Sequence, residues 1–178
     1  MNNVPEASSL NDMGLWFSVQ AFLNHEARLQ DDRLLDDWVA LFADDLRYWM
    51  PVITNRIGRD QGKELSLYGE VAHFDDDKTS LCNRVKRLST GMAWAETPAS
   101  RTRHLISNVE VMSQQPNGEI EVRSNFLIYR SHLEYDFEIF SGVRYDSLRP
   151  RAGSWQIFRR DITLDQSVVT QKNLGIFF

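Results

Sequence analysis

Cysteine is almost absent from this sequence: Cys82 is the single cysteine among 178 residues. No disulfide can therefore form within the chain, and the several thiolates that an iron-sulfur cluster or a structural zinc site usually needs are lacking. Long apolar runs are missing too. None approaches the roughly 20 residues that span a bilayer, and residues 1–11 lack the basic and apolar regions of a signal peptide. We therefore expect a soluble, cytoplasmic protein with no membrane partner.

An excess of positive charge is also lacking. The chain has 20 Lys and Arg against 25 Asp and Glu, which gives a net charge of −5, and no basic stripe runs along it. A nucleic-acid partner is therefore not expected. The sequence has no glycine-rich phosphate loop, no serine nucleophile elbow and no dinucleotide fingerprint. Phosphoryl transfer, triad hydrolysis and nicotinamide chemistry thus have no support.

Metal-ligand spacing is missing as well. His25, His73, His104 and His132 fall in four separate predicted elements, and no two of them have the four-residue spacing that presents a pair of imidazoles on one helix. The run Asp75–Asp77 lacks the spacing of a calcium loop and is better interpreted as the start of a helix. We expect no metal and no cofactor in this chain.

The sequence does contain 42% hydrophobic residues, enough for one sizeable core, so we expect residues 1–178 to form a single domain. Apolar residues at three- and four-residue spacing predict helices over residues 11–30 and 34–43. A third helix is predicted from the Asp75–Asp77 run to about Gly91.

The rest of the chain favours strands. Residues 46–53 are rich in strand formers, but Pro51 lacks a backbone donor, so this strand should lie at an edge or end there; residues 54–70 should form a loop. From residue 101 onward the apolar period is two, Asn117-Gly118 indicates a hairpin, and a last strand should run from Trp155 to about Leu164. The order of elements predicts an α+β fold, with helices on one face of a curved, mostly antiparallel sheet.

One strand shows two alternating sets of side chains, and we expect one face to be core and the other to be wet or interfacial. We interpret the charged face as the exposed one, because its arginines could form orientation-fixing pairs with a partner. The apolar set is Tyr135, Phe137, Ile139, Val143 and Tyr145, and the charged set is Glu134, Asp136, Glu138, Arg144 and Asp146.

One alternative is an enzyme. Asp44 and Asp45, which should end the second helix, could act with His104 as general acid and base in a sheet-lined cavity. Small α+β cones of this shape include isomerases and dehydratases, although this is an analogy of fold alone.

Several stretches, in this order and spacing, resemble the β subunits of Rieske-type aromatic-ring-hydroxylating dioxygenases, the naphthalene, biphenyl and benzoate class. The resemblance extends over most of the chain. The stretches are FDDDKT at 74–79 with RVKRL at 84–88, AWAETPASRTRH at 93–104, GVRYDSLR at 142–149, and FRRDITLDQ at 158–166 with the ending NLGIFF at 173–178.

The resemblance implies a cone-like fold of the nuclear transport factor 2 (cystatin-like) type and a non-catalytic structural role. Three β chains would form the stem of a mushroom-shaped assembly under three α chains. The α chain would carry the Rieske [2Fe-2S] cluster and the mononuclear Fe(II), and would receive electrons from a nicotinamide cofactor through separate reductase and ferredoxin chains. The whole complex would add both atoms of dioxygen to an aromatic ring to give a cis-dihydrodiol.

Interfaces would then be the chain's physical task. An equally open interpretation is that its arginines only bind acidic neighbours within the monomer. The apolar ending, Phe177 and Phe178 included, is too hydrophobic to be left in water and should pack against the chain's own sheet or a neighbouring β chain. The candidates for an interface or a structural network are Trp94, Arg101, Arg103, Arg159, Arg160, Asp161, Phe177 and Phe178.

Overall fold

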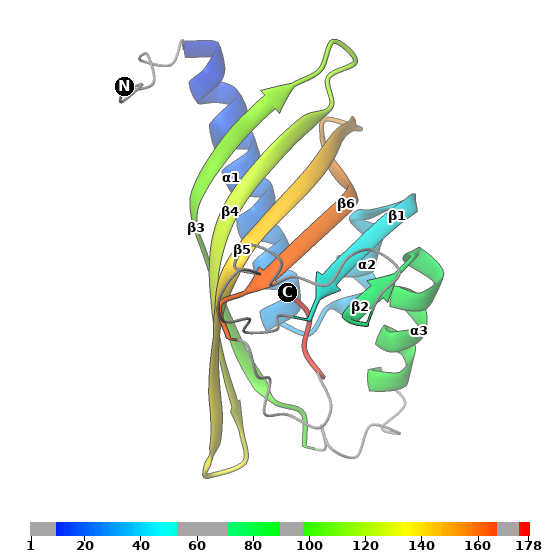
Figure 1. The fold of residues 1–178 in the computed structure, drawn as a ribbon, viewed down its shortest axis with the longest axis vertical. Helices are drawn as coiled ribbons and strands as arrows, with labels where there is room; N and C mark the ends of the chain where they lie inside the picture. Colours follow the sequence, from blue (N-terminus) through cyan, green and yellow to red (C-terminus); the bar gives the residue numbers. More distant parts are fainter. Residues whose placement is uncertain (1–9, 53–70, 90–97, 167–174) are drawn as a thin grey trace, which may run out of the picture.

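The computed structural model describes residues 10–52, 71–89, 98–166 and 175–178, and their strands form a six-stranded sheet in the order β2-β1-β6-β5-β4-β3 (Figure 1). β1 and β6 run parallel, and every other neighbouring pair is antiparallel. The strands are β1 (Phe42–Pro51), β2 (Ala72–Asp76), β3 (Arg101–Gln114), β4 (Ile120–His132), β5 (Asp136–Arg151) and β6 (Ser154–Leu164).

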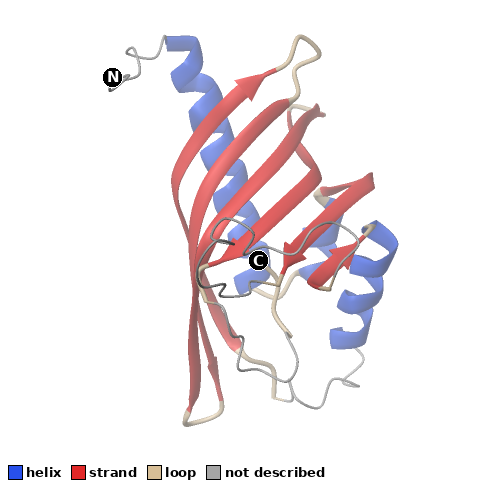
Figure 2. Ribbon diagram, in the orientation of Figure 1, coloured by secondary structure: helices blue, strands red, loops and turns tan. Residues whose placement is uncertain are grey.

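Three helices in the described part of the chain pack against this curved sheet (Figure 2). They are α1 (Leu10–Asp31), α2 (Leu35–Ala40) and α3 (Lys78–Ser89). α1 lies along the long strands and contacts β3, while α3 contacts β1 and β2. The predicted α+β class is therefore confirmed.

Helix α1 presents one stripe of side chains to the sheet, as its three- and four-residue spacing predicts. Trp16 also binds it to the sheet, because its Nε1 donates to the main-chain oxygen of Val109 at 2.9 Å. Toward its C-terminal end the stripe continues into Glu26 and Gln30, which are buried although they are polar. The apolar members of the stripe are Val19, Phe22, Leu23 and Ala27.

The hairpin between β3 and β4 turns at the predicted Asn117-Gly118 pair. Gly118 has φ of +85°, a conformation that glycine adopts without strain. Its N–H donates to the main-chain oxygen of Gln115 at 2.9 Å, and the side-chain oxygen of Asn117 accepts from the N–H of Glu119 at 3.1 Å. The turn thus fixes the register of β3 and β4.

Two predicted boundaries were wrong. The second helix ends at Ala40, and Asp44 and Asp45 lie inside strand β1. Phe42, which suggested one more helical turn, instead begins β1 and is buried, and it pairs with Ile157 of the parallel strand β6. As predicted, β1 ends at Pro51, although it lies between β2 and β6 and not at the sheet edge. The predicted loop 54–70 lies outside the described residues.

The Asp75–Asp77 run divides between two elements. Asp75 and Asp76 belong to β2, a strand that the sequence did not predict, and only Asp77 precedes the helix. Oδ1 of Asp77 accepts from the N–H of Ser80 at 2.7 Å, and this hydrogen bond lowers the pKa of Asp77. Asp77 therefore caps α3, while strand pairing with β1 takes the two residues before it.

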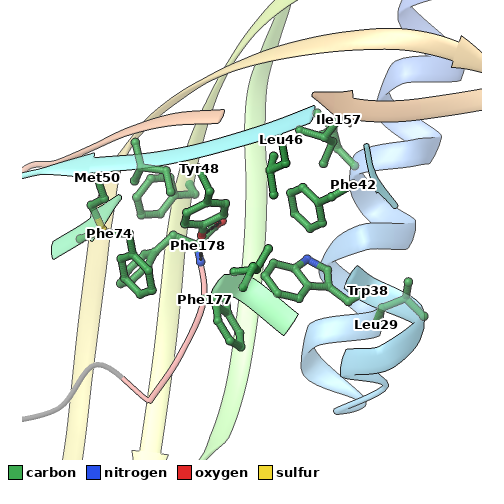
Figure 3. Close-up of a cluster of buried hydrophobic side chains, with 14 of the residues drawn as sticks. Leu29, Trp38, Phe42, Leu46, Tyr48, Met50, Phe74, Ile157, Phe177 and Phe178 are labelled. Atoms are coloured by element: carbon green, nitrogen blue, oxygen red, sulfur yellow. Dashed lines mark hydrogen bonds between the residues drawn. The ribbon is translucent and has the colours of Figure 1, made fainter. Parts of the chain in front are cut away.

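Aromatic rings fill the space between the sheet and the helices (Figure 3). The last residues of the chain enter this cluster: the ring centroids of Trp38 and Phe177 are 4.5 Å apart, and those of Phe140 and Phe178 are 5.5 Å apart. Ile176 and Phe177 are each 5% exposed, and Phe178 is fully buried. The apolar ending therefore packs against the chain's own sheet, one of the two places predicted for it.

The orientation of β5 is the reverse of the interpretation from sequence. The alternation is as predicted, but Arg144 and Asp146 point into the core, where they are 1% and 0% exposed. Phe137 and Ile139, which belong to the apolar set, are exposed on the opposite face. Charges can occupy the core here because they neutralise one another, and an apolar face is left open to the outside.

Candidate functional site

Apolar side chains gather on the outer face of the sheet, the face away from the helices. The pairing of the three strands β3, β4 and β5 places them in adjacent rows: Leu105 is opposite Leu127, and Tyr129 is opposite Ile139. Directly paired residues point to the same face of a sheet, so these side chains adjoin one another. The outer-face patch is defined as Leu105, Leu127, Tyr129, Phe137 and Ile139, each between 42% and 67% exposed.

The patch continues onto the tip of the β4–β5 hairpin, which extends beyond the helices (Figure 1). Leu133 and Tyr135 at this tip are 66% and 90% exposed. Scattered apolar residues on a surface need no explanation, but a contiguous set on paired strands is typical of a surface that a partner covers. The outer-face patch is therefore the candidate interface.

Four of the residues singled out from the sequence lie on this same outer face. Arg101 and Arg103 precede Leu105 at two-residue spacing on β3, so they continue its row of outward side chains. Arg159 and Asp161 lie on β6, the strand next to β5, and form an ion pair with an N–O distance of 2.6 Å. Charged groups thus flank the apolar patch, as they do at the rim of many interfaces.

The neighbouring residue, Arg160, points the other way and is fully buried. Its Nε donates to Oδ1 of Asp146 at 2.6 Å, and its Nη2 donates to Oε2 of Glu26 at 3.0 Å. Its Nη1 donates to Oε1 of Glu26 and, at 3.0 Å, to the main-chain oxygen of Phe178. Arg160 therefore links α1, β5, β6 and the last residue of the chain.

Arg144 completes this buried charge network. Its Nη2 donates to Oε2 of Glu26 at 3.3 Å, and its Nε lies 3.7 Å from Oδ2 of Asp146. Nε1 of Trp38 adds a hydrogen bond of 3.1 Å to Oε1 of Glu26. Two guanidinium groups face two carboxylates, so the charges of the four side chains cancel within the core.

The electrostatics of Glu26 follow from these contacts. Burial alone would raise the pKa of its carboxyl, but the guanidinium groups of Arg160 and Arg144, with the hydrogen bonds from Arg160 and Trp38, outweigh that effect and lower the pKa to about 2. Glu26 is therefore an anion at neutral pH. The opposite holds for Tyr48, whose pKa burial raises; its hydroxyl donates to the main-chain oxygen of Phe178 at 2.7 Å and accepts from the N–H of Phe178 at 2.9 Å.

His104 does not meet Asp44 or Asp45, and the hypothesis of an acid–base pair with either of them was wrong. Asp44 and Asp45 lie near the start of β1, where Asp44 pairs with Lys78 at 2.8 Å and Asp45 with Arg149 at 2.9 Å. The partner of His104 is Asp31, at the C-terminal end of α1. The sequence alone could not show which aspartate contacts His104, because Asp31, Asp44 and Asp45 all precede it by many residues.

The contacts of His104 favour a structural role. Its Nδ1 lies 2.6 Å from Oδ1 of Asp31, and its Nε2 lies 3.2 Å from the main-chain oxygen of Phe177. Both ring nitrogens therefore have acceptors from the chain itself. Asp31 also accepts from the N–H of His104 and pairs with the exposed Arg103 at 3.4 Å. The histidine connects α1, β3 and the chain's last residues.

Metal ligands do not converge in the part of the chain that the structure describes: no three His, Cys, Asp or Glu side chains there are placed to hold an ion. Cys82 lies half-buried in α3. Among the same residues, no helix combines the length and the apolar character needed to cross a bilayer. Trp94, the remaining candidate from the sequence, lies outside the described residues.

Comparison with known proteins decides the family. Residues 25–171 match the family described as "Ring hydroxylating beta subunit". The chain belongs to this family. It is 43% identical to the benzene 1,2-dioxygenase subunit beta of Pseudomonas putida over 92% of this chain and 89% of that protein. Identity to the biphenyl 2,3-dioxygenase subunit beta of Rhodococcus jostii is 41%, over 94% of this chain and 90% of the relative.

A solved structure has a fold similar to that of this β subunit. A naphthalene 1,2-dioxygenase structure with indole bound in its active site superposes with a TM-score of 0.81 at 19% identity, and the match covers 97% of this chain and 89% of that chain. The resemblance stated from the sequence motifs is therefore confirmed, and the cavity isomerase or dehydratase is not favoured.

The β subunit's buried charge network was largely missed from the sequence, which singled out only Arg160. The available signal was Glu26, because it stands seven residues after Val19 on the apolar stripe of α1. A carboxylate at a stripe position must be paired when it is buried, so it predicts buried cations nearby. The positions of Arg144 and Asp146 could not be inferred without knowing which face of β5 is inside.

Proposed function

We propose that this chain is the non-catalytic structural subunit of the terminal oxygenase component of an aromatic-ring dioxygenase, in which it supports an α subunit that cis-dihydroxylates aromatic hydrocarbons. Three α and three β chains would form the assembly. The Rieske cluster and the mononuclear Fe(II) would belong to the α subunit, and ferredoxin and reductase would act through it. A chain with one cysteine and no converging ligands among its described residues does not fit either iron centre.

The observation that carries the proposal is the outer-face patch in a chain of this family. The catalytic alternative needs a histidine with an open nitrogen, whereas His104 has acceptors at both nitrogens. A scaffold needs a broad apolar surface rimmed by charges, and the outer-face patch with Arg101 and Arg103 supplies that combination. A single domain over residues 1–178 and a cytoplasmic location belong to the same proposal.

Replacing Phe137 by aspartate tests this surface. Phe137 is 67% exposed, so the variant should fold with an unchanged melting temperature, but a charge within a covered apolar surface should prevent assembly. Phe17 on α1 is 68% exposed and provides a matched control. Co-expression with the α subunit and size-exclusion chromatography should show a complete complex for Phe17→Asp and separate chains for Phe137→Asp. Full-size complex with Phe137→Asp would contradict the proposed interface.

Replacing His104 by glutamine separates the scaffold from an enzyme. The side chain of glutamine cannot serve as a general base, yet it can still donate to Asp31, so the assembled complex should keep its turnover within about twofold while its melting temperature falls. Turnover should be measured per iron in the purified complex. A loss of a hundredfold or more, with assembly and iron content unchanged, would favour acid–base chemistry at His104.

A further inference from the structure

A cavity of about 250 Å³ opens between the C-terminal end of α1, the helices α2 and α3, the start of β3 and the last residues of the chain. It lies apart from the outer-face patch, on the helix side of the sheet. Its walls are mainly apolar, and His104 and Thr102 contribute polar groups from β3. The apolar walls include Leu35, Val85, Leu88, Ile176 and Phe177.

Gln30 gives this cavity an unusual polar group. The residue is 5% exposed, and among the described residues neither the nitrogen nor the oxygen of its side-chain amide has a hydrogen-bond partner. Buried polar groups are almost always paired, because leaving one without a partner destabilises the protein. Gln20 on the same helix shows the ordinary case, since its Nε2 donates to Oδ1 of Asn24 at 3.0 Å. The Gln30 amide is therefore an unmatched donor and acceptor at the wall of a cavity.

The charged neighbours of the cavity are engaged or lie at its edge. Nη2 of Arg33 donates to the main-chain oxygens of Ala99 at 3.0 Å and Ser100 at 2.7 Å. His104 is held by Asp31. Asp36 is exposed and lines the opening, where its negative charge disfavours an anion. A neutral ligand fits these surroundings better than an ion.

The size and lining define the ligand further. An apolar cavity of about 150 Å³ can hold benzene, so a larger one accommodates one or two rings. The ring of Phe177 offers a face or edge to an aromatic ligand. Gln30 presents a donor and an acceptor together, and a hydroxyl or carboxamide group complements both.

We propose that this cavity is a binding site for a neutral molecule of one or two rings that carries a hydroxyl or amide group, and that Gln30 is the residue that recognises this group. The site is separate from the proposed assembly surface and does not depend on it. It gives the β subunit a ligand-binding property in addition to a structural one.

Phenol and benzene are the probes that test it, because they share a ring and differ by one hydroxyl. Titration of the full-length β chain, followed by the backbone amide signals of the lining residues Thr102 and His104 in ¹⁵N-correlated NMR spectra, should give saturable binding of phenol. Phenol should bind about tenfold more tightly than benzene, as one buried hydrogen-bonding group allows. Gln30→Met should weaken phenol binding by about tenfold and leave benzene binding unchanged, whereas Gln20→Met should change neither.

A second variant keeps the test valid if Gln30→Met does not fold. Ala99 is exposed and lines the opening, so Ala99→Trp should leave the fold intact and weaken the binding of both probes. The proposal is overturned if phenol shows no saturable binding, or if folded Gln30→Met binds phenol as well as the wild type does. It is equally overturned if a crystal soaked in phenol holds only ordered water against the Gln30 amide.

Discussion

Arg160→Ala is expected to lower the free energy of unfolding by about 3 to 5 kcal/mol, which is a large part of the stability of an ordinary domain. Removal of this guanidinium leaves Glu26 and Asp146 buried side by side, with only Arg144 to neutralise them. It also removes the hydrogen bond to the main-chain oxygen of Phe178. Urea denaturation followed by circular dichroism measures the loss.

The adjacent residue gives a matched control. Arg159 has the same side chain on the same strand, but its side chain is 47% exposed and it pairs with Asp161 at the surface. Arg159→Ala should therefore cost less than about 1 kcal/mol. If both variants lose the same free energy of unfolding, the buried charge network is no more important for stability than an ion pair at the surface.

The same network predicts how stability depends on pH. The pKa of Glu26 is about 2 in the folded protein, below its ordinary value of 4.5. A depressed pKa contributes stability that is fully present above pH about 4.5 and is lost as pH falls toward 2. Arg160→Ala removes the main cation that lowers the pKa of Glu26, so burial raises this pKa. Acid unfolding of Arg160→Ala should therefore begin at a higher pH than that of Arg159→Ala.

The sequence predicted which elements exist better than which way they face. The spacing in α1, the Asn117-Gly118 turn and the alternation in β5 are local signals, and all three have the expected structure. Alternation alone defines two faces and does not say which one is inside. For β5 the answer depends on Glu26, which is 134 residues from Arg160 in the sequence and adjacent to it in space.

Long-range pairing also explains the misplaced boundaries. Residues 42 and 43 fit the helical spacing of the residues before them, but pairing with the parallel strand β6 makes them part of β1. The partner of His104 was misjudged for a related reason. Asp31 and Asp44 both precede His104 by many residues, and only the end of α1 brings one of them within 2.6 Å.

Phe178→Ala is expected to lower the free energy of unfolding by about 3 to 5 kcal/mol, because it leaves a ring-sized void in the aromatic core. The Phe178 side chain is fully buried, and its ring lies 5.9 Å from that of Phe126 and 5.5 Å from that of Phe140, measured between centroids. The main-chain contacts with Tyr48 and Arg160 can persist in the variant, so the loss reports the side chain and not the network. Phe17→Ala, at a position 68% exposed, should change stability by less than about 0.5 kcal/mol. Thermal and urea unfolding measure the stability of both variants. If Phe178→Ala is as stable as Phe17→Ala, the side chain of Phe178 does not stabilise the aromatic core.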